Sequence, residues 1–144
     1  MQTFLPHPSF VKSAKALDDK RLGKQRVEAY QIMKALADPD YGWQHHPAVQ
    51  MWRGYEDALV EYGSACCMVW VLRGFKDSLL GKFTDRAWPR PSRMPPWFGD
   101  TEFHRSHQSN LIRKDATHYG PQFPGVPGSL PYVWPANDEY RVCT

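Results

Sequence analysis

Residues 17–36 read LDDKRLGKQRVEAYQIMKAL, and this stretch decides the fold that we expect for the chain. Its apolar residues recur on one side with the period of an α-helix: Leu22, Ala29, Met33 and Leu36. Arg21, Lys24 and Glu28, spaced i, i+3 and i+7, lie together on another side. One surface of this helix is therefore expected to enter a core, while the other carries two cations and a carboxylate.

Two interpretations of that polar surface are open. In the first, Lys24 and Glu28 are an i,i+4 ion pair that stabilises an exposed helix by roughly a few tenths of a kcal/mol and does nothing else. In the second, the carboxylate and the cations belong to a site. Gly23 indicates either the close approach of another group or a later helix start, because glycine destabilises a helix interior by up to about 1 kcal/mol relative to alanine.

The composition limits the class of protein. The 144 residues are enough for a single domain (residues 1–144) with a real core, and 42% hydrophobic and 14% aromatic residues exclude a disordered chain. The net charge of +3, the six histidines and a pI of about 8.8 permit a polyanionic partner without requiring one.

Cysteine usage and the lack of long apolar runs favour a cytoplasmic protein. Cys66 and Cys67 are neighbours in an apolar stretch and Cys143 is isolated, a pattern that fits neither a disulfide framework nor a CxxC zinc site. The N-terminus lacks the basic and apolar segments of a signal peptide, and no 18-residue apolar stretch could span a membrane. We therefore expect reduced thiols, no membrane contact and a cytoplasmic, nucleoid-associated location.

The first half of the chain predicts three helices. They cover residues 10–17, 18–37 and 47–75. Ser9 is suited to cap the first helix, and Asp18 or Asp19 the second, because their side-chain oxygens can accept from the first-turn amides. Pro47 is suited to the first turn of the third helix.

The second half predicts one more helix between two irregular segments. This helix covers residues 102–116, with Asp100 or Thr101 as its cap. The four prolines of residues 82–99 exclude a long helix there, and the tail from about residue 119 is expected to wrap the helices without forming a strand. The predicted fold class is thus all-α: a single compact domain of three to four helices with a long Pro-rich loop and an irregular C-terminal tail.

The Pro-rich loop interleaves cations with aromatic rings, and it also has two interpretations. The residues concerned are Arg86, Trp88, Arg90, Arg93 and Trp97. They fit either a loop that packs its tryptophans on the core or a basic-aromatic strip that contacts phosphates and stacks on bases.

Two motifs resemble those of a known family. RVEA at residues 26–29 and YGWQHHP at residues 41–47, with HisPro at residues 7–8, follow the order and spacing of the pyrimidine dimer DNA glycosylase family, of the endonuclease V type. The resemblance covers roughly residues 1–60. Residues 103–114, FHRSHQSNLIRK, stand where that family has its third helix.

The resemblance implies an all-α DNA repair enzyme, a DNA glycosylase and AP lyase that needs no cofactor. In that family an α-amine attacks C1′ of the damaged nucleotide, displaces the base and forms an imine, and a glutamate stabilises the cationic sugar and assists β-elimination. These roles would fall on Met1 and Glu28. The chemistry is reasonable, because an α-amine with a pKa of about 7.7–8.0 is partly neutral at neutral pH and an anion stabilises an oxocarbenium-like sugar.

The resemblance also implies double-stranded DNA as the partner of a monomer, held through its phosphates. Val27 stands where the family has an arginine before the glutamate, so other cations would have to hold the phosphates. The candidate DNA contacts are Arg21, Lys24, Arg26, His46, His104, His107, Asn110, Arg113 and Lys114.

Three alternatives are open at the level of the sequence. The first is the same chemistry on a different lesion or modified base. The second is a non-catalytic nucleic-acid-binding module on the same scaffold. The third is a metal-dependent hydrolase, in which His104 and His107, spaced i and i+3 on a helix, bind a metal with Glu28 or His46.

Overall fold

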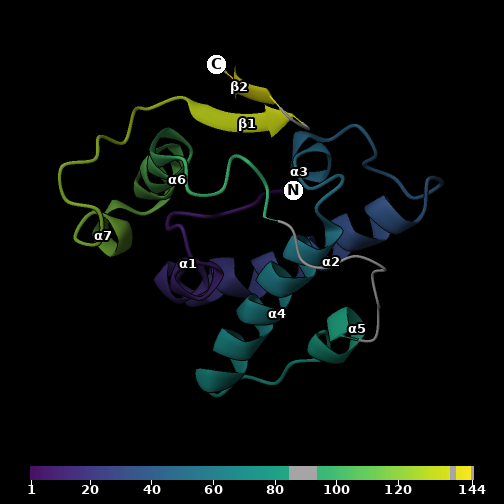
Figure 1. Cartoon of the computed structure of the whole chain (residues 1–144). Helices are drawn as coiled ribbons and strands as arrows, with labels where there is room; N and C mark the ends of the chain where they lie inside the picture. Colours follow the sequence, from purple (N-terminus) through teal and green to yellow (C-terminus); the bar gives the residue numbers. More distant parts are fainter. Residues whose placement is uncertain (85–93, 137–138, 144) are drawn as a thin grey trace.

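The computed structural model describes residues 1–84, 94–136 and 139–143. Within these residues seven helices precede one pair of strands (Figure 1). The elements are α1 (Phe10–Ala16), α2 (Asp19–Ala37), α3 (Pro47–Gln50), α4 (Glu56–Leu72), α5 (Leu80–Thr84), α6 (Thr101–Lys114), α7 (Ala116–Tyr119), β1 (Tyr132–Ala136) and β2 (Glu139–Cys143). The predicted all-α fold class is confirmed, and no helix in the described part of the chain is long and apolar enough to cross a membrane.

Helix α2 packs mainly on α4, and α1 packs on the same helix. Leu22, Ala29 and Met33 are buried as the sequence predicted, whereas Leu36 lies at the edge of the core. Gly23 allows the close approach that its place in the helix indicated, because a Cβ there would lie 3.0 Å from the indole ring of Trp70.

The predicted caps are present in the structure. The Ser9 side chain accepts from the amide of Lys12, and the Asp18 side chain accepts from the amide of Arg21. At α6 the cap is Asp100, which accepts from two first-turn amides. Local hydrogen bonding therefore fixes where these three helices begin.

The single helix predicted over residues 47–75 is wrong. The chain leaves the helix after Gln50, passes through Gly54 with φ of +90°, and re-enters at Glu56. Buried Trp52 explains the interruption, since its ring stacks on Tyr62 and meets the edge of Trp97. A continuous helix could not satisfy these distant aromatic contacts, and only glycine adopts the left-handed conformation without strain.

The prediction of a tail without strands is also wrong. Strands β1 and β2 pair antiparallel, with Tyr132 opposite Cys143 and Ala136 opposite Glu139. Strand β1 lies against α6, where the Ser106 hydroxyl accepts from the amide of Val133 at 3.2 Å. The contact with Ser106 is distant in sequence, but only two residues separate the strands from each other, so the pairing of β1 with β2 was a local signal that the prediction missed.

Of the Pro-rich residues 82–99 the structure describes residues 82–84, which belong to α5, and residues 94–99. Trp97 is buried among Trp52 and Phe103, which agrees with the interpretation of this ring as part of the core. The remaining members of the predicted basic-aromatic strip, residues 86, 88, 90 and 93, lie outside the described residues.

Candidate active site

The N-terminal segment, residues 1–6, runs extended through the middle of the molecule and is held by side chains rather than by a neighbouring strand. Its backbone groups bond to α2, α4, α6 and β1. The bonds are Gln2 N–H to Glu28 Oε2 (2.5 Å), Gln25 Nε2 to Gln2 O (2.9 Å), Tyr132 hydroxyl to Thr3 O (2.5 Å), Phe4 N–H to Gln25 Oε1 (2.6 Å), Tyr62 hydroxyl to Phe4 O (2.6 Å), Leu5 N–H to His107 Nδ1 (3.0 Å), His104 Nδ1 to Leu5 O (2.7 Å) and Gln108 Nε2 to Pro6 O (2.7 Å).

Gln25 is the central side chain of this arrangement. It is only 1% exposed, donates to the Gln2 carbonyl, and accepts from both the Phe4 amide and the Tyr62 hydroxyl, the latter at 2.8 Å. Because buried polar groups are costly unless paired, this set of bonds fixes the segment relative to α2.

His104 and His107 hold the backbone of Leu5 from α6. The Nε2 atom of His104 accepts from the amide of Gly99 at 2.8 Å, so its proton sits on Nδ1, which donates to the Leu5 carbonyl. His107 uses Nδ1 as an acceptor for the Leu5 amide. Burial lowers the pKa of both rings, and with the nearby His104 it brings the pKa of His107 to about 3. Both rings are therefore neutral hydrogen-bonding groups.

These bonds bear on the metal-dependent alternative. They occupy both ring nitrogens of His104 and Nδ1 of His107 with backbone groups. Glu28 accepts a hydrogen bond from the Gln2 amide. The described residues contain no cluster of three or more His, Cys, Asp or Glu side chains suited to a metal. The geometry offers no support for a metal site built on these histidines.

The Glu28 carboxylate accepts from the amide of Gln2, the residue that follows Met1. The charge of Glu28 also affects the pKa of two other groups. Burial lowers the pKa of His46, the α-amine lowers it further, and Glu28 acts in the opposite direction. Burial raises the pKa of Tyr132, and Glu28 adds to that rise. The charge of Glu28 therefore acts on one imidazole and one phenol.

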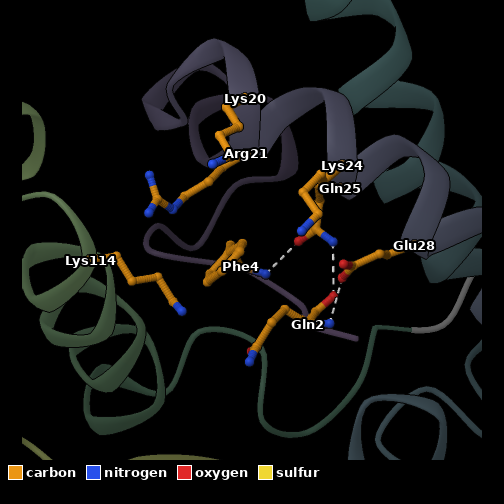
Figure 2. A pocket seen from close by; sticks show the side chains of 8 residues that line it. All are labelled: Gln2, Phe4, Lys20, Arg21, Lys24, Gln25, Glu28 and Lys114. Carbon is orange, nitrogen blue, oxygen red and sulfur yellow. Dashed lines mark hydrogen bonds between the residues drawn. The ribbon is translucent and has the colours of Figure 1, made fainter.

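A cavity of about 180 Å³ opens beside Glu28 (Figure 2). Its lining residues are Gln2, Phe4, Lys20, Arg21, Lys24, Gln25, Glu28 and Lys114. Three of its four cations come from α2, where their spacing places them on one surface, and Lys114 faces them from the last turn of α6. We call this site the cationic pocket. Its charge suits an anionic group held next to the carboxylate.

Among the residues predicted to contact DNA, the structure brings Arg21, Lys24 and Lys114 together in the cationic pocket. His46 lies nearby and caps α3, with Nδ1 accepting from the amide of Ala48 at 3.0 Å. The cap gives one ring nitrogen of His46 a role within the fold.

Other residues that were predicted to contact DNA form contacts within the protein. Arg26 forms an ion pair with Asp77 and lies over the ring of Trp70 at 4.6 Å, away from the cationic pocket. Arg113 donates to the carbonyls of Gly128 and Leu130 at 2.8 and 3.2 Å and to Asn110 at 3.3 Å. His104, His107 and Asn110 are buried. Their predicted DNA contacts stay predictions, and their observed contacts are within the chain.

Sequence reasoning missed several residues of this site. Lys20 could have been found, because it is spaced i, i+4 from Lys24 on the surface that carries Glu28. Gln25 also left a signal, as a polar residue between Leu22 and Ala29 on the apolar side. Tyr132 left none, since only the folded chain brings it to the N-terminal segment.

The sequence model described as pyrimidine dimer DNA glycosylase matches residues 1–81, more than half of the chain. The chain belongs to the pyrimidine dimer DNA glycosylase family. The predicted resemblance is thereby confirmed and extended past residue 60, and membership supports a role in DNA repair with DNA as substrate. No curated protein and no solved structure matched.

The part of this glycosylase that matches the family contains Glu28 and the α2 side of the cationic pocket. The remaining partners of the N-terminal segment, His104, His107 and Tyr132, lie beyond it, as does Lys114. The matched part of the chain is thus completed by α6 and β1.

Proposed function

We propose that this protein is a monomeric, cofactor-independent DNA glycosylase and AP lyase that acts on pyrimidine dimers in duplex DNA, with the α-amine of Met1 as nucleophile and Glu28 as catalytic carboxylate. One observation carries the proposal. The Gln2 amide binds Glu28 Oε2 at 2.5 Å, which holds the carboxylate one residue from the amine.

In this mechanism the neutral amine forms a bond to C1′ as the bond from C1′ to the base breaks, and the base leaves with the electron pair and takes up a proton. The amine then loses a proton, the C1′–O4′ bond breaks as O4′ keeps the electron pair and takes up a proton, and the nitrogen lone pair forms an imine between Met1 and C1′. Loss of a C2′ proton expels the 3′ phosphate oxygen and cleaves the strand. Glu28 stabilises the cationic sugar and accepts protons in the later steps.

The cationic pocket supports a phosphate-binding role beside this reaction. Lys20, Arg21, Lys24 and Lys114 line it together with Glu28. Ammonium and guanidinium groups bind phosphate oxygens, and such contacts position a duplex without reading its sequence. The pocket thus offers a way to hold the backbone next to C1′ although Val27 replaces the family's arginine.

Glu28→Gln is the sharpest test, because glutamine keeps an oxygen for the Gln2 amide but removes the charge. Duplexes with a thymine dimer, with an abasic site, or with neither would be incubated with protein and borohydride, and adducts mapped by mass spectrometry. We expect an adduct on the Met1 peptide with the wild type, and on the order of 100-fold slower trapping for the variant. Binding of DNA should change little.

The matched control is Glu61→Gln, which removes an exposed carboxylate from α4. It should trap at the wild-type rate. Equal rates for the Glu28 variant and the wild type would show that Glu28 is not catalytic. A wild type that binds DNA but yields no adduct would favour a non-catalytic binding module, and an adduct with the abasic duplex alone would point to another lesion or modified base.

A further inference from the structure

The cationic pocket carries positive charge that the fold does not use. Lys20, Lys24 and Lys114 line it, and within residues 1–84, 94–136 and 139–143 none of their ammonium groups has an ion pair or a hydrogen bond. Arg21 is the exception, since it is paired with Asp18 at 3.1 Å. Like charges that share a cavity repel one another, so the arrangement is stabilised by an anion bound among them.

Lys114 reaches this pocket from a different element than the other cations. It lies in the last turn of α6, and Figure 2 shows its side chain extending from that helix towards the N-terminal segment. The neighbouring Arg113 holds the carbonyls of Gly128 and Leu130, whereas Lys114 is exposed and holds no part of the described chain. Its charge is therefore available to a ligand.

Glu28 lines the same pocket and keeps one oxygen available. Its Oε2 atom accepts from the Gln2 amide, but Oε1 has no hydrogen-bond partner in the part of the chain that the structure describes. The i,i+4 ion pair with Lys24 that the spacing allows is not formed. One cavity of about 180 Å³ thus presents a carboxylate oxygen and unpaired cations together.

Strand cleavage by β-elimination needs these two kinds of group side by side. A base removes the C2′ proton from the protonated imine, the C–H electron pair forms C1′=C2′, and the nitrogen takes up the C1′=N pair. That pair then restores C1′=N, the C1′=C2′ pair forms C2′=C3′, and the C3′–O3′ bond breaks with its electrons on the phosphate. The leaving phosphate changes from a diester with one negative charge to a monoester with about two.

We propose that the cationic pocket, through Lys114 in particular, binds the 3′ phosphate of the reacting nucleotide and stabilises the charge that appears on it as the strand breaks. This inference rests on the proposed function. The proton leaves C2′ and the phosphate leaves the next carbon, so the cations must lie beside the carboxylate, as they do here. Because the second charge develops only at this step, the cations act on its transition state more than on binding of the duplex.

Lys114→Ala separates strand cleavage from imine formation. The side chain is exposed at the end of α6, so alanine removes the charge with little effect on folding. An abasic duplex labelled at the 3′ end of the reacting strand would be mixed with a saturating excess of protein. Borohydride added at successive times reduces the imine and stops elimination, so an uncleaved strand stays on the protein while a cleaved strand releases the labelled fragment.

We expect Lys114→Ala to form the imine at about the wild-type rate and to release the fragment on the order of 10-fold more slowly, so that the uncleaved adduct accumulates. The matched control is Lys76→Ala, which removes an exposed cation beyond the end of α4 and should behave as the wild type. Equal losses in imine formation and fragment release, or no loss in fragment release, would overturn the proposal.

A binding measurement tests the same site without any reaction. The probe is a duplex with a one-nucleotide gap, whose downstream strand begins with either a 5′ phosphate or a 5′ hydroxyl. The wild type should bind the phosphate form on the order of 10-fold more tightly, and Lys114→Ala should lose most of that preference. A hydroxyl duplex with a phosphate at its distant 5′ end has the same total charge and should show no preference.

Equal binding of the two gapped duplexes by the wild type, or an unchanged preference in Lys114→Ala, rules out a leaving-phosphate site in the cationic pocket. Failure of the proposed function is seen independently, as the absence of a Met1 adduct with the wild type.

Discussion

His104 and His107 hold Leu5 only while their rings are neutral. A second proton on His104 would lie on Nε2, where it would face the N–H of Gly99. A proton on His107 Nδ1 would face the N–H of Leu5 in the same way. His107 accordingly takes up its proton at a pKa of about 3 when folded, against an ordinary value of 6.5. The unfolded chain binds that proton more tightly, so acid favours unfolding.

The sign and range of this effect give a prediction. Stability should fall as pH drops from about 6.5 towards 3, by up to about 1.4 kcal/mol per pH unit for His107. His107→Asn keeps an acceptor for the Leu5 amide but cannot be protonated. Denaturant unfolding should show that the variant is less stable than the wild type at neutral pH. Between pH 7 and about pH 5 its free energy of unfolding should fall by about 2 kcal/mol less than that of the wild type.

The control for this measurement is His45→Asn, at an exposed position in the loop before α3. It should leave the pH dependence of unfolding unchanged. Parallel pH profiles for the wild type and the His107 variant would contradict the assignment of His107 as a neutral acceptor.

At the scale of the element, the N-terminal segment is irregular backbone whose bonding partners are side chains. Each of Gln2, Phe4 and Leu5 has both its amide and its carbonyl bonded to a side chain. A sheet would provide such bonds by repetition, whereas here each bond depends on a particular residue. The element is therefore sensitive to single substitutions far from it in sequence.

Gln25→Leu tests that sensitivity. Leucine fits the space but leaves the Phe4 amide and the Gln2 carbonyl without their partner, at about 1–3 kcal/mol for each unsatisfied group. We expect a lower free energy of unfolding, faster amide exchange at Gln2 and Phe4, and slower imine trapping with DNA binding kept. Gln31→Leu, at a half-buried position on the same helix, should show none of these changes. Unaltered exchange and trapping in Gln25→Leu would contradict this role.

At the scale of the whole molecule, the net charge of +3 understates the local field. Four cations, Lys20, Arg21, Lys24 and Lys114, converge on the cationic pocket. Other cations are paired with carboxylates elsewhere, such as Arg26 with Asp77 and, at the surface, Arg73 with Asp19, and Arg21 itself is paired with Asp18. Binding of a polyanion should therefore be concentrated on one side of the protein rather than spread over it.

The salt dependence of DNA binding measures this concentration. Lys24→Ala should weaken binding about equally for dimer and undamaged duplexes, and it should reduce the slope of log K against log salt by about 1. Lys76→Ala removes an exposed cation beyond the end of α4 and should leave the slope unchanged. Identical slopes for Lys24→Ala and the wild type would place the phosphate contacts elsewhere.

The separation in sequence between contacting residues explains which features of the molecule the sequence could predict. Helices α1, α2 and α6 and their caps follow from period and hydrogen bonding within a few residues, and the cations of α2 follow from the same period. The interruption at Gly54 goes with the contact of Trp52 with Trp97, and the place of β1 in the molecule depends on Thr3 and Ser106. Those contacts form between distant residues, so no local pattern encodes them, whereas the pairing of β1 with β2 is local in sequence.

The bonds of the N-terminal segment also have a consequence for the order of synthesis. A ribosome makes residues 1–6 long before some of their partners, since Leu5 bonds to His107 across 102 positions and Thr3 bonds to Tyr132 across 129. A growing chain can offer Glu28 and Gln25 to the segment early, whereas α6 and β1 emerge only much later. On the proposed mechanism, the segment that carries the nucleophile is fixed in place only once α6 and β1 have been made.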